Sequence, residues 1–251
     1  MYPSSYKGNG RLQVTNGNLL AENLTLKQII RFAYDLPERE LVGGPAWINE
    51  KTFDIKAKTD RVAAIDEAQL SEEQREAYDS QKLIPLQKLL ENRFQLKVIR
   101  EDRVLPFYAI VAAKGGIKIK PSDENSDRKQ LPPNSFAAGL GNGGIRTPGI
   151  RVAGQGKLVA IKVTLDQLAR FLTAMRSGGA PAVDRPVLNK TGLVGEYDFT
   201  LEFTPGAGAD SGDSVPGLFT AIQEQLGLKL EPQKGPLEVT VIDHVELPSE
   251  N

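Results

Sequence analysis

Two stretches of the chain share one pattern of apolar and polar positions. Residues 25–32 read TLKQIIRF and residues 164–171 read TLDQLARF, so Thr, Leu, Gln, Arg and Phe keep the same register. In each stretch the apolar residues recur at the spacing of one helix face. The Thr and the Gln three residues later form the capping-box pattern that marks the start of a helix. The sequence therefore predicts amphipathic helices over 25–35 and 164–175.

Matching landmarks surround the two predicted helices in the same order. The corresponding segments are 11–21 with 150–162, 52–55 with 196–199, 94–98 with 226–230, and Pro106 with Pro236. Ordered matches of this kind predict an internal repeat. We expect an α+β protein of two tandem similar halves, each about β-β-α-β-α-β-β with a mixed or antiparallel sheet. A pseudo-twofold axis is expected to relate the halves.

The same comparison divides the chain into four parts. We expect a loose N-terminal segment over 1–10, a first repeat over 11–113, a Gly/Pro/polar connection over 114–149 and a second repeat over 150–251. A long polar connection of this composition supports a boundary, because such loops are uncommon inside a compact domain.

Some element boundaries are expected from breaks in these patterns. A charged helix is expected to open at Ser71 and to be interrupted at Pro85. Apolar runs at 95–101 and 105–113 predict two strands that form a hairpin. Apolar runs at 228–231 and 237–245 predict two separate strands that close the second repeat.

Composition narrows the function classes. The 251 residues carry a formal net charge of −1 and no cysteine, which excludes disulfides and thiolate chemistry. A nearly neutral chain has no broad attraction to nucleic acid, and no apolar run is long enough to span a membrane. We therefore expect neither a nucleic-acid partner nor membrane insertion. The first residues also lack the apolar region of a signal peptide.

Three residues are candidates for chemistry. His244, the single histidine, is a candidate general base, with Glu246 on its strand face and Asp243 on the opposite face. Asp198 and Glu202 share one face of a predicted strand and are candidate paired carboxylates or Ca²⁺ ligands. The alternative for all three is a structural or surface role.

Weaker candidates lie in turns and loops. Asp210 and Asp213 lie in a Gly/Ser/Asp loop and are possible oxygen ligands for a divalent ion, although their spacing does not match an EF-hand. Trp47 follows a Gly-Gly-Pro turn and is a candidate anchor for a ligand, the alternative being a cap over the first repeat helix. No cofactor is expected, with Ca²⁺ or another divalent ion as the alternative.

A set of motifs carries a family resemblance across almost the whole chain. They are TLKQIIRFAY at 25–34, GGPAWI at 43–48, FDI at 53–55, LLENRF at 89–94, YAIV at 108–111, KGG at 114–116, KTGL at 190–193, YDFT at 197–200 and VIDHVELPSEN at 241–251. Together they resemble an uncharacterised soil-bacterial family expanded in Acidobacteria, a domain of unknown function also found fused to BlaR1-type membrane metallopeptidases. The resemblance implies an extracytoplasmic location, secreted or periplasmic, and supplies no catalytic residues.

The expected function is an extracytoplasmic binding or interaction module for an unidentified small molecule or protein. No nucleophile, base and orienting group converge in the sequence, so no chemistry of its own is expected. One alternative is a hydrolase of esters, lactones or phosphoesters that uses carboxylates, with or without a divalent ion, and His244 as the base. Another is a sensor domain for a membrane partner.

Overall fold

The chain forms two compact units. The computed structural model describes residues 2–3, 10–15, 18–58, 72–131, 149–153, 156–177, 180–204 and 216–248. Unit 1 comprises Met1–Asp102 and Glu238–Asn251, and unit 2 comprises Arg103–Leu237. The repeats expected from the sequence were defined by sequence similarity, whereas the two units are defined by contacts in space. The repeat boundaries therefore stay a prediction.

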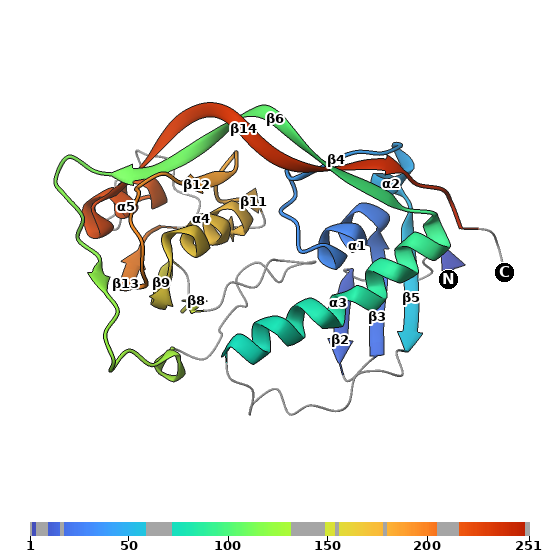
Figure 1. Ribbon diagram of the computed structural model, residues 1–251, viewed down its shortest axis with the longest axis horizontal. Helices are drawn as coiled ribbons and strands as arrows, with labels where there is room; N and C mark the ends of the chain where they lie inside the picture. Colours follow the sequence, from blue (N-terminus) through green and yellow to red (C-terminus); the bar gives the residue numbers. More distant parts are fainter. Residues whose placement is uncertain are drawn as a thin grey trace. The chain divides into compact units, whose positions relative to one another are not determined.

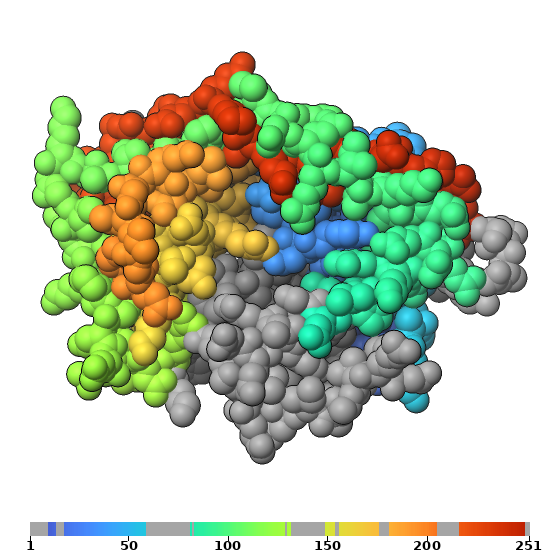
Figure 2. All heavy atoms as spheres, viewed as in Figure 1, coloured from blue at the N-terminus to red at the C-terminus, as the bar shows by residue number. Residues whose placement is uncertain are grey.

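Unit 1 contains a four-stranded antiparallel sheet in the order β1-β5-β3-β2 (Figure 1). Its strands are β1 (Tyr2–Pro3), β2 (Arg11–Thr15), β3 (Asn18–Thr25) and β5 (Thr52–Lys58). Its helices are α1 (Leu26–Ala33), α2 (Trp47–Glu50) and α3 (Glu72–Phe94). Helix α1 contacts β3, α2 and α3 and so lies at the centre of the unit. In the space-filling view the C-terminal part of α3 lies at the surface (Figure 2, teal).

The first predicted helix and its capping box are confirmed. The Thr25 hydroxyl accepts from the Gln28 amide at 3.3 Å, and the Gln28 side chain accepts from the Thr25 amide at 2.9 Å. A cap of this kind stabilises a helix by about 1 kcal/mol. The apolar face of the helix is fully buried, through Leu26, Ile29, Ile30 and Ala33.

Unit 2 contains a second four-stranded antiparallel sheet, in the order β7-β13-β9-β8. Its strands are β7 (Lys120–Pro121), β8 (Ile150–Val152), β9 (Lys157–Val163) and β13 (Tyr197–Glu202). Its other elements are the 3₁₀ turn η1 (Arg128–Gln130), α4 (Leu165–Ala174), the short pair β10 (Arg176–Ser177) and β11 (Ala180–Pro181), and α5 (Leu218–Leu226). The segment expected as a connection thus begins with β7 and η1.

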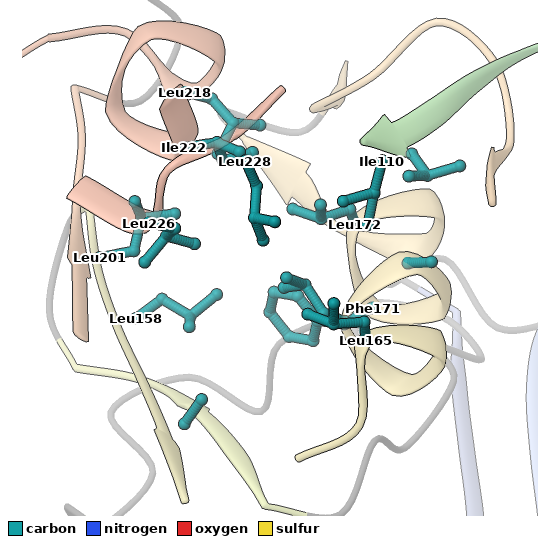
Figure 3. Close-up of a cluster of buried hydrophobic side chains, with 14 of the residues drawn as sticks. Ile110, Leu158, Leu165, Phe171, Leu172, Leu201, Leu218, Ile222, Leu226 and Leu228 are labelled. Atoms are coloured by element: carbon teal, nitrogen blue, oxygen red, sulfur yellow. The ribbon is translucent and has the colours of Figure 1, made fainter. Parts of the chain in front are cut away.

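The core of unit 2 lies between α4, α5 and the sheet. Figure 3 shows side chains from both helices meeting those of the strands, with Leu165, Phe171, Leu172, Leu218, Ile222 and Leu226 facing Leu158, Leu201 and Leu228. All are almost completely buried. Each such side chain contributes about 1.5–3 kcal/mol when it leaves water. The second capping box, between Thr164 and Gln167, is also confirmed.

A third sheet has the order β12-β6-β14-β4. Its strands are β4 (Leu41–Gly43), β6 (Lys97–Ala112), β12 (Val187–Asn189) and β14 (Leu228–His244). The unit boundaries fall inside β6, after Asp102, and inside β14, after Leu237. Unit 1 therefore holds β4 parallel to the end of β14, and unit 2 holds β12 parallel to the end of β6.

Two strand boundaries expected from the sequence are wrong. Residues 97–112 form one strand, β6, where a hairpin over 95–101 and 105–113 was expected, and residues 228–244 form one strand, β14, where two were expected. The two long strands are hydrogen-bonded neighbours, so each continues through the polar residues that suggested a turn. A cross-strand ion pair, Arg100 Nη1 to Glu238 Oε1 at 3.2 Å, lies along them.

The helix break expected at Pro85 is also wrong, because α3 runs through it. An interior proline costs about 3 kcal/mol. The turns after it bury Leu86, Leu90 and Phe94, at about 1.5–3 kcal/mol each. The Gln87 side-chain amide also donates to the last carbonyl of α1, Ala33 O, at 2.7 Å. Burial of the side chains that follow Pro85 therefore outweighs the preference of proline to end a helix.

The mixed α+β class expected from the sequence is confirmed, with antiparallel sheets in both units and parallel pairs in the third sheet. The pseudo-twofold relation between two similar halves stays a prediction. No helix in the part of the chain that the structure describes has the length and apolar character needed to cross a membrane.

Replacing Gly227 with alanine should destabilise the protein far more than replacing Gly116. Both glycines have left-handed backbones, at φ +67° and +78°, which cost a side chain about 1–2 kcal/mol. A Cβ on Gly227 would also lie 2.0 Å from the Gly116 carbonyl oxygen, whereas one on Gly116 would meet nothing within 4 Å. Overpacking should add about 1–3 kcal/mol at Gly227 alone. Urea unfolding would measure both variants, and equal losses would contradict the expected clash.

Candidate functional site

Asp198 joins three segments of unit 2. Its carboxylate accepts hydrogen bonds from the Lys162 amide at 2.8 Å, from the Ser122 hydroxyl at 2.5 Å and from the Ser126 hydroxyl. Lys162 lies near the end of β9 with φ +52°, where the pairing of β9 with β13 shifts register. The aspartate therefore holds the irregular end of β9 and the loop after β7 against β13.

These hydrogen bonds set the charge state of Asp198. Burial acts to raise the pKa of the carboxyl group, but the Lys162 amide and the Ser122 and Ser126 hydroxyls outweigh it, so the pKa is lowered. A carboxylate that accepts several hydrogen bonds is stabilised in its charged form. Asp198 is therefore ionised, and its carboxylate oxygens accept hydrogen bonds that stabilise the fold.

Arg128 secures the same region from η1. Its Nε donates to the Ile161 carbonyl at 3.1 Å, and its Nη2 donates to the Lys162 carbonyl. The same Nη2 lies 3.5 Å from Glu196 Oε1. Burial lowers the pKa of Arg128, and Glu196 opposes that shift. Both backbone polar groups of Lys162 are thus held by charged side chains.

An open depression of about 520 Å³ lies over this network, lined by Ser122, Asp123, Glu124, Lys162 and Glu196. Its volume falls within the range of sites for small ligands, about 300–1,000 Å³. The segment 114–131, which contributes part of the lining, lies at the surface of unit 2 (Figure 2, yellow-green).

The loop that borders the depression is fixed by its own hydrogen bonds. The Ser122 amide donates to the Glu196 carbonyl at 2.9 Å. The Asp123 amide donates to the Ser126 hydroxyl at 3.1 Å, and the Asn125 amide donates to Asp123 Oδ1 at 2.8 Å. The charged groups of the loop are therefore presented from an ordered backbone.

Charge in the depression is unevenly distributed. Three carboxylates, on Asp123, Glu124 and Glu196, share it with one ammonium group, on Lys162. Among the described residues, the Lys162 ammonium forms no ion pair. The lining thus offers acceptors for a cationic group and a single donor for an anionic or carbonyl group.

Of the residues predicted from the sequence, Asp198 contacts Ser122 and Lys162, which line this depression, and Glu202 does not line it. Glu202 is exposed and pairs with Lys157 Nζ at 2.8 Å. His244 belongs to unit 1, where its Nε2 lies 2.9 Å from Glu246 Oε1 at the surface. No single unit therefore contains Asp198, Glu202 and His244 together.

The remaining candidates fall elsewhere. Trp47 is half-buried in unit 1 and packs edge-on against Phe53, with ring centroids 6.4 Å apart. Asp210 and Asp213 lie outside the described residues. Within the described ranges, no group of three or more His, Asp or Glu side chains is arranged to hold a metal ion.

Sequence reasoning missed the residues that line and support the depression. Ser122, Ser126 and Arg128 lie in the segment expected as a connection, and Lys162 at a strand end. One signal was available in the sequence, because Asp54 corresponds to Asp198 in the predicted repeat. Asp54 Oδ1 accepts from the Asn23 amide at 2.9 Å, and Asn23 also has a left-handed backbone, at φ +50°.

The structure thus defines a mixed α+β protein whose described part carries a polar depression, two of whose lining residues are hydrogen-bonded to an aspartate. Over residues 27–245 the chain matches the family described as "Protein of unknown function (DUF3738)", and it belongs to that family. No curated protein and no solved structure matches the chain. The function must therefore be argued from the site.

Replacing Asp198 with asparagine should destabilise the protein and flatten its response to acid. An amide cannot accept all three hydrogen bonds, and because their donors are half-buried, each one left without a partner should cost less than the roughly 1–3 kcal/mol of a fully buried group. Because folding lowers the pKa of Asp198, its contribution is present above the unfolded pKa of about 3.9 and is lost as pH falls through the lower folded value.

Denaturant unfolding at neutral pH and below about pH 4 would measure this effect. The gap between wild type and Asp198→Asn should shrink in acid. Glu202→Gln is the matched control, because it removes an exposed ion pair on the same strand that is worth at most about 1 kcal/mol. Equal losses for the two variants at neutral pH would show that Asp198 has no special role.

Proposed function

We propose that the chain is an extracytoplasmic binding module that holds a small polar, positively charged ligand in the depression of unit 2. The observation that carries the proposal is the lining of three carboxylates and one ammonium group around about 520 Å³. The extracytoplasmic location rests on the family resemblance seen in the sequence.

The geometry supports binding because the lining is preorganised. Asp198 and Arg128 hold Ser122, Lys162 and Glu196 in place before any ligand arrives. A site whose groups are already ordered loses less conformational entropy on binding. The rigid network therefore favours recognition of one arrangement of charges.

The lining also indicates the chemical class of the ligand. An ammonium or guanidinium group would be attracted to the carboxylates of Asp123, Glu124 and Glu196. A carboxylate or carbonyl on the same molecule would accept from Lys162. Amino acids and short peptides combine these groups, amino sugars combine an ammonium group with hydroxyl acceptors, and a purely anionic ligand lacks the ammonium group.

The described groups support binding over catalysis. The hydroxyls of Ser122 and Ser126 donate to Asp198, whose lowered pKa makes its carboxylate a weak base. Activating a serine nucleophile requires an adjacent general base of suitable pKa. The hydrolase and the sensor remain alternatives from the sequence, and no specific contact of the described residues favours the hydrolase.

We also propose that the two halves expected from the sequence, residues 11–113 and 150–251, are copies of one module related by a pseudo-twofold axis. In support, the antiparallel sheets have corresponding strand orders, β1-β5-β3-β2 and β7-β13-β9-β8. In each unit an aspartate, Asp54 or Asp198, accepts from the amide of a left-handed residue two positions before the capping Thr, Asn23 or Lys162.

Binding to the depression should be measurable by titration calorimetry with lysine, a glycine dipeptide and glucosamine as probes. At least one should bind saturably, and Glu196→Gln and Lys162→Met should each weaken it about tenfold, or about 1.4 kcal/mol, because each removes one charged contact. Glu202→Gln, an exposed carboxylate outside the depression, should bind as wild type does. No saturable heat with any probe up to about 10 mM, or equal weakening by the control, would overturn the proposal.

A further inference from the structure

An exposed apolar side chain lies next to the charged depression of unit 2. Val194 is 94% exposed and precedes by two residues Glu196, which lines the depression. Consecutive Cα atoms are about 3.8 Å apart, so the Cα atoms of Val194 and Glu196 are at most about 7.6 Å apart. A ligand that occupies the depression can therefore reach Val194 if it extends beyond the lining.

The turn that presents Val194 is held by hydrogen bonds. The amide and the hydroxyl of Thr191 donate to Asn189 Oδ1 at 3.1 and 2.8 Å, and the Leu193 amide donates to Thr191 Oγ1 at 3.1 Å. The Tyr197 hydroxyl donates to the Val194 carbonyl at 3.3 Å. Single exposed apolar residues are common, so exposure alone indicates nothing. A fixed position beside a charged site is different, because an ordered group loses little entropy when a partner covers it.

The depression itself is open to solvent. Sites for free small molecules bury about 70–90% of the ligand surface, and an open depression leaves one side of its ligand uncovered. A side chain that belongs to a larger molecule needs no such enclosure, because the rest of that molecule makes contacts outside the depression. The openness of the site therefore favours a side chain presented by a polypeptide.

The charges of the lining fit a basic side chain within a peptide. The carboxylates of Asp123, Glu124 and Glu196 attract a lysine ammonium or an arginine guanidinium group. The Lys162 ammonium is the single cation of the lining, and it can donate to a peptide carbonyl. Every residue of a peptide carries such a carbonyl, so the ligand needs no carboxylate of its own.

The spacing of the two contacts fits an extended peptide. In an extended chain the residues at i and i+2 point to the same side, and their Cα atoms are about 6.4–6.8 Å apart. That separation is close to the upper limit of about 7.6 Å between Val194 and Glu196. A basic side chain in the depression thus places the side chain two positions away near Val194.

We propose that the depression binds a lysine or arginine side chain of an extended polypeptide, and that Val194 contacts an apolar side chain two positions along the same polypeptide. The inference rests on the binding function proposed above, and it adds the class of partner and a second contact. The recognised segment is then basic-Xaa-apolar.

The test compares three pentapeptides with blocked termini by titration calorimetry on the full chain. Gly-Lys-Gly-Leu-Gly carries the proposed pair, Gly-Lys-Gly-Ser-Gly lacks the apolar side chain, and Gly-Gln-Gly-Leu-Gly lacks the charge. The leucine peptide should bind about fivefold more tightly than the serine peptide, because the contact with Val194 removes apolar surface from water. The glutamine peptide should give no saturable heat up to about 10 mM.

A substitution at Val194 tests the second contact directly. Val194→Ser should remove the preference, so that the leucine and serine peptides bind with equal affinity. The exposure of Val194 means that this change should leave the folded state intact. Val104→Ser is the matched control in the same unit, because Val104 is also exposed, at 64%, and is not among the lining residues. That variant should keep the preference of the wild type.

Equal affinity of the wild-type protein for the leucine and serine peptides would overturn the inference, and so would a preference that persists in Val194→Ser. Free lysine separates this inference from the proposed function. If lysine binds saturably and the peptides do not, the depression holds a small molecule and the polypeptide partner is wrong. If none of the peptides and none of the free probes binds, the proposed function fails as well.

Discussion

The fold depends on the connection between a strand of each antiparallel sheet and the helix that follows it. In unit 2 the turn from β9 into α4 passes through Lys162, whose left-handed backbone takes its amide out of the strand pairing. A backbone amide left without a partner costs up to about 1–3 kcal/mol when it is buried, and Lys162 is half-buried. Asp198 reduces that cost by accepting from this amide, and the capping box of Thr164 then starts the helix. The carboxylate thus ties the end of β9 to β13 just before α4 begins, and Arg128 holds the same strand end through the Ile161 and Lys162 carbonyls.

Local features of the fold could be predicted from the sequence, and non-local ones could not. The helices that begin after Thr25 and Thr164 can be predicted from a few consecutive residues, because capping and helix periodicity are short-range patterns. The continuity of β6 and β14 depends on pairing between strands more than a hundred residues apart. The path of α3 through Pro85 likewise depends on burial against other elements, which no local pattern reports.

The candidate site shows the same division. Asp198 could be singled out because carboxylates on a strand are visible in the sequence, but its role could not be foreseen. Its partners Ser122 and Lys162 are 76 and 36 residues away along the chain. Arg128 reaches Ile161 from 33 residues away. A loop rich in Ser, Asp and Asn carries no local sign that distant donors and acceptors will fix it in place, so its composition suggested a simple connection.

The role of Asp198 in unit 2 depends on how the chain is anchored around it. The serine that reaches Asp198 belongs to a segment anchored on both sides, by Ile119 and by Arg128. The Asp198 carboxylate is therefore committed to structure, and the ligand site that we propose uses the charged groups of the residues that line the depression, Asp123, Glu124, Lys162 and Glu196.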